Sequence, residues 1–109
     1  MNLEEYRINR RRTMNFDLNI EEQRLNAALG LGESGELQNI VKKEVYHGHP
    51  VDVLAILDEA GDILFYLDWI LETYGWTLEN AMIGNVNKLR KRYPQGFDPE
   101  RSINRSENG

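Results

Sequence analysis

The sequence contains no cysteine and only two histidines in 109 residues. The absence of cysteine excludes a disulfide framework, a thiolate metal site and a cysteine nucleophile. Long hydrophobic runs are absent too, because four acidic residues interrupt the most apolar stretch, residues 53–71. The first fifteen residues are charged and no apolar run follows them, so they do not resemble a signal peptide. We therefore expect a protein of the cytoplasm that does not enter a membrane.

An excess of positive charge is also missing. The formal net charge of −5 at pH 7 argues against general nucleic-acid binding by the surface, despite the local run from Arg10 to Arg12. Contents of 40% hydrophobic and 28% charged residues are typical of a globular chain. The length suits one small domain with a single core.

The pattern of apolar residues predicts an all-α protein, a small bundle of about four helices. No segment alternates polar and apolar residues over the length of a strand. Asn19 is suited to cap the second helix, and the sequence from His47 to Pro50 ends it. We predict helices at residues 2–14, 20–46, 51–74 and 77–93. They form one domain over residues 1–97, and we expect the polar tail at 98–109 to be disordered.

Two pairs of acidic residues are each separated by three positions: Glu33 with Glu36, and Glu59 with Asp62. In a helix, residues at this spacing point from the same face, with their Cβ atoms about 5–6 Å apart. Like charges at this spacing destabilise an isolated helix, so two such pairs require a compensating interaction. A hard divalent cation such as Mg²⁺, which prefers oxygen ligands, provides one.

The first pair falls within the apolar stripe predicted for its helix, close to Leu25 and Leu29. A buried carboxylate without a partner is costly, and metal ligation removes that cost. The alternative is that Glu33 and Glu36 lie at the edge of the stripe and reach solvent.

The second pair shares one arc of the third helix with Tyr66 and Trp69. Considered alone, this arc is also typical of a helix with one acidic, solvated face. Two successive helices joined by a short loop lie antiparallel, so their acidic faces can oppose each other and bring four carboxylates to one site. Tyr66 and Trp69 can then stack on a base, and packing in the core or between subunits is the alternative role for both.

The fourth helix carries Asn85, Lys88 and Arg92 at three- and four-residue steps along one flank. An amide, an ammonium and a guanidinium in a row suit a polyphosphate that also bridges a metal. The alternative is the positive charge that helix C-termini usually carry. The acidic pairs on two neighbouring helices favour the phosphate interpretation.

These residues resemble the MazG-type all-α nucleoside triphosphate pyrophosphohydrolases. The motifs that carry the resemblance are Glu33-Ser-Gly-Glu36, a 22-residue spacer, Glu59-Ala-Gly-Asp62 and then Asn85-Val-Asn-Lys88. The resemblance covers residues 20–97. It implies a helical core assembled into a dimer or tetramer, and hydrolysis of an NTP or dNTP to the monophosphate and pyrophosphate, a housekeeping reaction of the nucleotide pool.

The resemblance also implies a site. Mg²⁺, or Mn²⁺ in its place, would be held by the four acidic residues, Glu33, Glu36, Glu59 and Asp62. Asn85 and Lys88 would contact the phosphates of the substrate, and we add Arg92 and Lys42 as further phosphate contacts. The superfamily includes dUTPases, dCTP pyrophosphatases and phosphoribosyl-ATP pyrophosphatases, and the sequence does not select among them.

Metal-assisted hydrolysis needs a group that accepts a proton from the attacking water. Glu33 is our candidate, with Glu36 beside it, because Glu33 lies deepest in the apolar arc, where burial makes a carboxylate a better proton acceptor. The competing interpretation is a non-enzymatic helical module that dimerises for interaction or regulation. The third helix is apolar over most of its circumference, so in either case we predict a homodimer or homotetramer.

Overall fold

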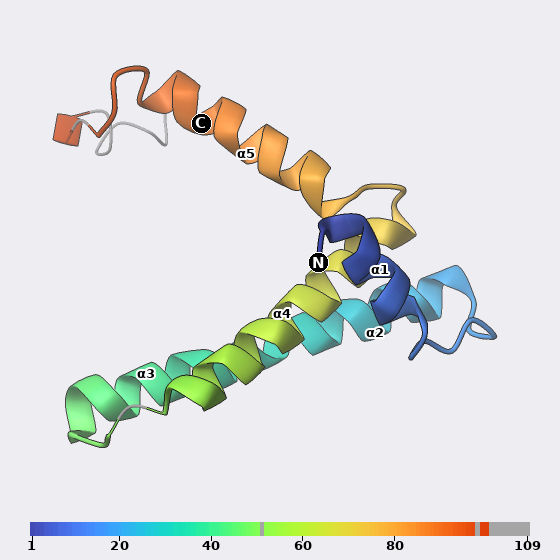
Figure 1. Cartoon of the computed structure of the whole chain (residues 1–109), viewed down its shortest axis with the longest axis horizontal. Coiled ribbons are helices and arrows are strands. Elements are labelled where there is room, and N and C mark those ends of the chain that lie inside the picture. Colours follow the sequence, from blue (N-terminus) through green and yellow to red (C-terminus); the bar gives the residue numbers. More distant parts are fainter. Residues whose placement is uncertain (51, 98, 101–109) are drawn as a thin grey trace. The chain divides into compact units, whose positions relative to one another are not determined.

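The computed structural model describes residues 1–50, 52–97 and 99–100 (Figure 1). Its elements in chain order are α1 (Leu3–Arg11), α2 (Ile20–Leu31), the 3₁₀ turn η1 (Gly32–Ser34), α3 (Gly35–His47), α4 (Val53–Thr73) and α5 (Leu78–Arg92). The prediction of an all-α fold is confirmed. Among the described residues, no helix is long and apolar enough to span a membrane.

The chain divides into two compact units, Met1–Trp76 and Thr77–Gly109. In the first unit, α2, η1 and α3 follow one another along α4, which returns beside them (Figure 1). The second unit contains α5. Apart from residues 99–100, the tail predicted at 98–109 lies outside the described residues.

The helix starts follow from local capping. The Asn19 side chain accepts a hydrogen bond from the backbone N–H of Glu22 at 2.8 Å, which confirms the predicted cap of α2. Thr77 and Asn80 form a reciprocal capping box at the start of α5. Gly48, with φ of 67°, ends α3 in the left-handed conformation that glycine adopts without strain.

The prediction of one continuous helix over residues 20–46 is wrong. A 3₁₀ turn at Gly32–Ser34 separates α2 from α3. Three glycines lie in or beside this turn: Gly30, Gly32 and Gly35. Each weakens the α-helix because glycine loses the most backbone entropy on ordering. Short 3₁₀ segments are the usual result where the α-helical hydrogen-bond pattern is strained.

Gly30 has a second role, because it lies directly against the Tyr66 ring of α4. A Cβ atom added at Gly30 would lie 2.3 Å from Cδ1 and Cε1 of the Tyr66 ring. The Tyr66 ring also stacks on Trp69, with ring centroids 6.3 Å apart. Trp69 is buried, and its indole N–H donates to Oε1 of Gln23 on α2 at 3.4 Å. The core of the first unit is therefore an aromatic cluster on α4 packed against α2.

Candidate metal centre

The four predicted acidic residues are carried by adjoining elements of the first unit. Glu33 lies in η1 and Glu36 in the first turn of α3, while Glu59 and Asp62 lie in the first half of α4. Both η1 and α3 pack against α4 (Figure 1). The first acidic motif, on η1 and α3, thus lies on elements that pack against α4, which carries the second motif.

Three carboxylates of α4 form the tightest group. One oxygen each from Asp58, Glu59 and Asp62 lie within 4.8 Å of one another. The sequence analysis did not include Asp58 among the ligands. The signal that could have found it is its spacing, because Asp58 and Asp62 are four residues apart and share one helix face.

The charge environment of Glu59 shows that the two motifs converge. Partial burial raises the pKa of Glu59, and the negative charges of Asp62, Glu36, Asp58 and Glu33 raise it further, in that order. Two of these four carboxylates belong to the glutamate motif of η1 and α3. The negative charges of both acidic motifs therefore act on Glu59.

The expected burial of the first glutamate pair is wrong for the single chain. Glu33 and Glu36 are both exposed, and so are their apolar neighbours Leu25 and Leu29, at 60% and 66%. The apolar stripe that we predicted exists as a pattern on α2, but in the single chain it is not covered along its length. The alternative interpretation, that both glutamates reach solvent, describes their placement.

The donor set fits a hard divalent cation. It contains only carboxylate oxygens, which Mg²⁺ and Mn²⁺ prefer over nitrogen or sulfur ligands. A cation among Asp58, Glu59 and Asp62 would remove the repulsion that raises the pKa of Glu59. The charges of Glu33 and Glu36 act on Glu59, but neither residue belongs to the group of Asp58, Glu59 and Asp62 whose oxygens lie within 4.8 Å of one another.

An open groove of about 630 Å³ runs along α3 and reaches α4. Its lining is mainly apolar, and it includes Ser34 and Ile63, the sequence neighbours of Glu33 and Asp62. Lys42, which we predicted as a phosphate contact, lines this groove. The groove is therefore lined by Lys42 but by none of the predicted acidic ligands. The complete lining is Ser34, Leu37, Gln38, Val41, Lys42, Tyr46 and Ile63.

The other predicted contacts lie elsewhere. Tyr66 and Trp69 pack against α2 in the single chain, as their alternative role required, and stacking on a base stays a prediction. Asn85, Lys88 and Arg92 are carried by α5 in the second unit, at the predicted spacing along one helix. Asn85 and Lys88 are exposed on it.

The fold and the site together define a small all-α protein. Its acidic motifs lie on η1 and α3 and on α4, the helix that packs against them. The family model of the MazG nucleotide pyrophosphohydrolase domain matches residues 21–97, well over half of the chain. The chain belongs to this family. Comparisons with curated proteins and with solved structures found no match.

Proposed function

We propose that this protein is a Mg²⁺-dependent nucleoside triphosphate pyrophosphohydrolase. It cleaves an NTP or dNTP between the α and β phosphates and releases the monophosphate and pyrophosphate. The observation that carries this proposal is the convergence of carboxylates from η1, α3 and α4 on Glu59, in a chain of the MazG family. A cluster with this much uncompensated charge is suited to a cation that also binds polyphosphate.

The metal ligands in this proposal are the four acidic residues of the two motifs together with Asp58. A Mg²⁺ ion held by these residues would supply charge neutralisation of the polyphosphate and acidification of water. The side chains of the cluster orient the cation, and one carboxylate accepts the proton of the attacking water. Glu33 remains our candidate for this role, although its exposure removes the argument from burial. A Glu33→Gln variant that binds metal and keeps substantial turnover would exclude it.

Asn85 and Lys88 on α5 contact the phosphates in this proposal, with Arg92 one turn further along and Lys42 at the groove. Amide and ammonium groups at helical spacing match successive phosphate oxygens. The base and sugar are not specified by these contacts, so a dUTPase, a dCTP pyrophosphatase and a phosphoribosyl-ATP pyrophosphatase remain alternatives within the superfamily. The substrate pool favours the cytoplasm as the location.

Exposed leucines support assembly into a homodimer or homotetramer. Leu54 and Leu57 near the start of α4 are 75% and 68% exposed, and they add to Leu25 and Leu29 on α2. Large apolar side chains left exposed on neighbouring helices are typical of a surface that another subunit covers. A monomer at micromolar concentration in light scattering would contradict this part of the proposal.

Product analysis tests the reaction. The purified chain is incubated with Mg²⁺ and each common NTP and dNTP, beside a Glu36→Ala, Asp62→Ala double variant and a Glu44→Gln control on the same helix as Glu36. Monophosphate and pyrophosphate, lost in the double variant but kept in the control, are the expected result. Diphosphate and orthophosphate would contradict the bond that we propose is cleaved.

The absence of turnover would favour the second candidate, a non-enzymatic interaction or regulatory module. The exposed apolar surface on α2 and α4 is the observation that supports it. The two candidates differ in their response to metal. The enzyme should be stabilised by millimolar Mg²⁺ through binding to the folded state, and the module should not.

A further inference from the structure

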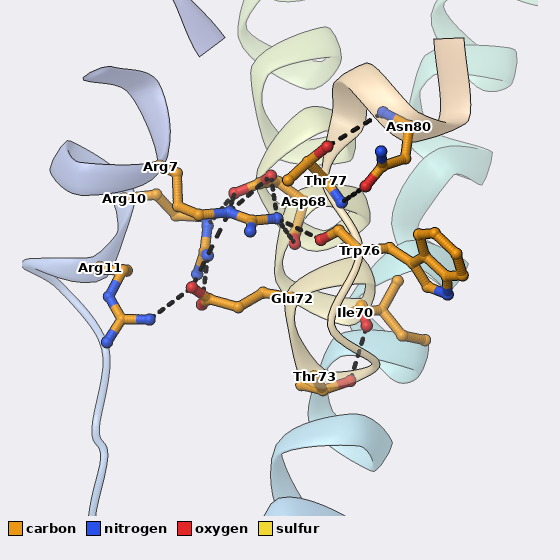
Figure 2. Close-up of polar contacts among 10 residues, drawn as sticks. All are labelled: Arg7, Arg10, Arg11, Asp68, Ile70, Glu72, Thr73, Trp76, Thr77 and Asn80. Atoms are coloured by element: carbon orange, nitrogen blue, oxygen red, sulfur yellow. Dashed lines mark hydrogen bonds and ion pairs between the residues drawn. The ribbon is translucent and has the colours of Figure 1, made fainter. Parts of the chain in front are cut away.

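The charged side chains that join α1 to α4 have partners within the chain (Figure 2). Arg10 donates from Nε to Asp68 and from Nη2 to Glu72, both at 2.7 Å. The side chains of Arg10 and Asp68 are almost completely buried, so these ion pairs form a buried network. Two charged residues of α5, Glu79 and Arg90, differ, because neither forms an ion pair with a described residue.

One face of α5 is an open groove with an apolar centre and a charge at each end. The groove has a volume of about 390 Å³, and its lining comes entirely from α5. Met82, Ile83 and Val86 form its centre and are 55%, 54% and 42% exposed. Glu79 lies at its N-terminal end and Arg90 at its C-terminal end. The surface therefore combines three exposed apolar side chains with two opposite charges.

A helix of this kind needs a packing partner. α5 has 15 residues, and isolated helices of about this length are marginal in water. Its capping box, in which Thr77 and Asn80 each accept a hydrogen bond from the backbone N–H of the other, stabilises only the first turn (Figure 2). We therefore expect the apolar face of α5 to be covered when the helix is stable.

The groove is complementary to a second copy of itself. Glu79 and Arg90 are centred on the same point of α5 as Ile83 and Val86. A two-fold axis through that point, perpendicular to the helix, places a second α5 antiparallel to the first. Glu79 of each copy then faces Arg90 of the other, and Ile83 and Val86 of both copies meet around the axis. Within one helix the two charges are roughly 16 Å apart along the axis, too far to pair with each other.

We propose that α5 pairs with α5 of a second copy of this chain, antiparallel across a two-fold axis. Glu79 and Arg90 form reciprocal ion pairs on both sides of an apolar centre. This surface is separate from the exposed leucines of α2 and α4, and the pairing does not depend on the proposed reaction. At about 100° per residue, Asn85 and Lys88 lie on the side of α5 away from the groove. The pairing therefore leaves the proposed phosphate contacts uncovered by the second α5.

Charge reversal tests the pairing. In an oligomer of one variant, Glu79→Lys or Arg90→Glu places like charges opposite each other twice. We expect each reversal to raise the dissociation constant of the oligomer roughly 5- to 30-fold, measured by sedimentation from nanomolar to micromolar concentration. Lys88→Glu is the matched control, because it makes the same change of charge as Arg90→Glu on the other side of α5. It should associate like the wild type.

Two further samples identify the partner of each charge. An equimolar mixture of the Glu79→Lys and Arg90→Glu chains should associate within about two-fold of the wild type, because opposite charges face each other again in the mixed pair. The double variant that carries both reversals should recover in the same way. A variant whose helix is only destabilised would show neither recovery.

Three results would overturn the proposal. The first is a dissociation constant for both single reversals within about two-fold of the wild type. The second is a loss of association that neither the mixture nor the double variant restores, because the charges would then face a different surface. The third is a wild type that stays monomeric over the whole concentration range. All these measurements concern association, so a failure to turn over nucleotides would leave them unchanged.

Discussion

Substitution of Gly30 by alanine should destabilise the protein, although alanine is the better helix former. The added Cβ would lie 2.3 Å from two carbons of the Tyr66 ring and 2.6 Å from a third. Carbon atoms in contact are normally about 3.5–4.0 Å apart, so the overlap exceeds 1 Å. The obstructing group is a ring held by Trp69, and it cannot move aside as the end of a flexible side chain could.

The magnitude follows from two opposing contributions. Replacing glycine by alanine in a helix gains about 1 kcal/mol, and less at Gly30 because it is the second-last residue of α2. Inserting a methyl group into a packed contact costs about 1–3 kcal/mol. We therefore expect a net loss of about 1–2 kcal/mol in the free energy of unfolding, or a fall of roughly 4–16 °C in melting temperature.

Gly61→Ala is the matched control. Gly61 lies inside α4, and an added Cβ there meets no atom within 4 Å among the described residues. This variant should be more stable than the wild type by up to about 1 kcal/mol, since only helix propensity changes. The difference between the two variants then measures the cost of the overlap with Tyr66.

A double-mutant cycle identifies the partner. Urea unfolding is followed at one fixed protein concentration, because assembly makes stability depend on concentration. Tyr66→Ala removes all three ring atoms that the new methyl group would meet. In that background Gly30→Ala should be neutral or stabilising, with a coupling of about 0.5–3 kcal/mol. If Gly30→Ala behaves like Gly61→Ala in the wild-type background, α2 and α4 do not make this close contact.

Three further predictions concern charge. Glu59→Gln should raise the metal-free melting temperature, because repulsion from neighbouring carboxylates is lost. It should also reduce the rise in melting temperature that Mg²⁺ causes. The control variant Glu44→Gln should change neither quantity. Asp68→Ala should cost about 3–5 kcal/mol in urea unfolding, because the buried Arg10 loses one of its two carboxylate partners, and a loss below about 1 kcal/mol would contradict the buried network. Although partial burial alone would raise it, hydrogen bonds from α1 lower the pKa of Glu72 below its usual 4.5. Unfolding then takes up a proton at low pH, so this stabilisation is complete above about pH 4.5 and is lost as the pH falls below it; a Glu72→Gln variant should show a flatter pH dependence, measured by thermal unfolding.

The sequence was sufficient for most of the helix positions and for recognising the two acidic motifs. Helix positions follow from the periodicity of apolar residues, and the caps at Asn19 and Thr77 follow from side chains that satisfy backbone N–H groups. The acidic motifs could be recognised because helical spacing alone places their members on one face. These features depend on residues within a few positions of one another, so no tertiary information was needed.

Burial and long-range pairing could not be predicted in the same way. Periodicity showed that α2 has an apolar stripe, but whether Glu33 within it is covered depends on which surface packs against it, and in the single chain it is exposed. The contact of Gly30 with Tyr66 depends on the distance between α2 and α4. The attachment of Arg10 to Asp68 joins residues 58 positions apart.

The sequence by itself determined the helices and the carboxylates they carry. Only the tertiary structure decided which charges meet, because the energy of a charge depends on the distance to other charges and to water.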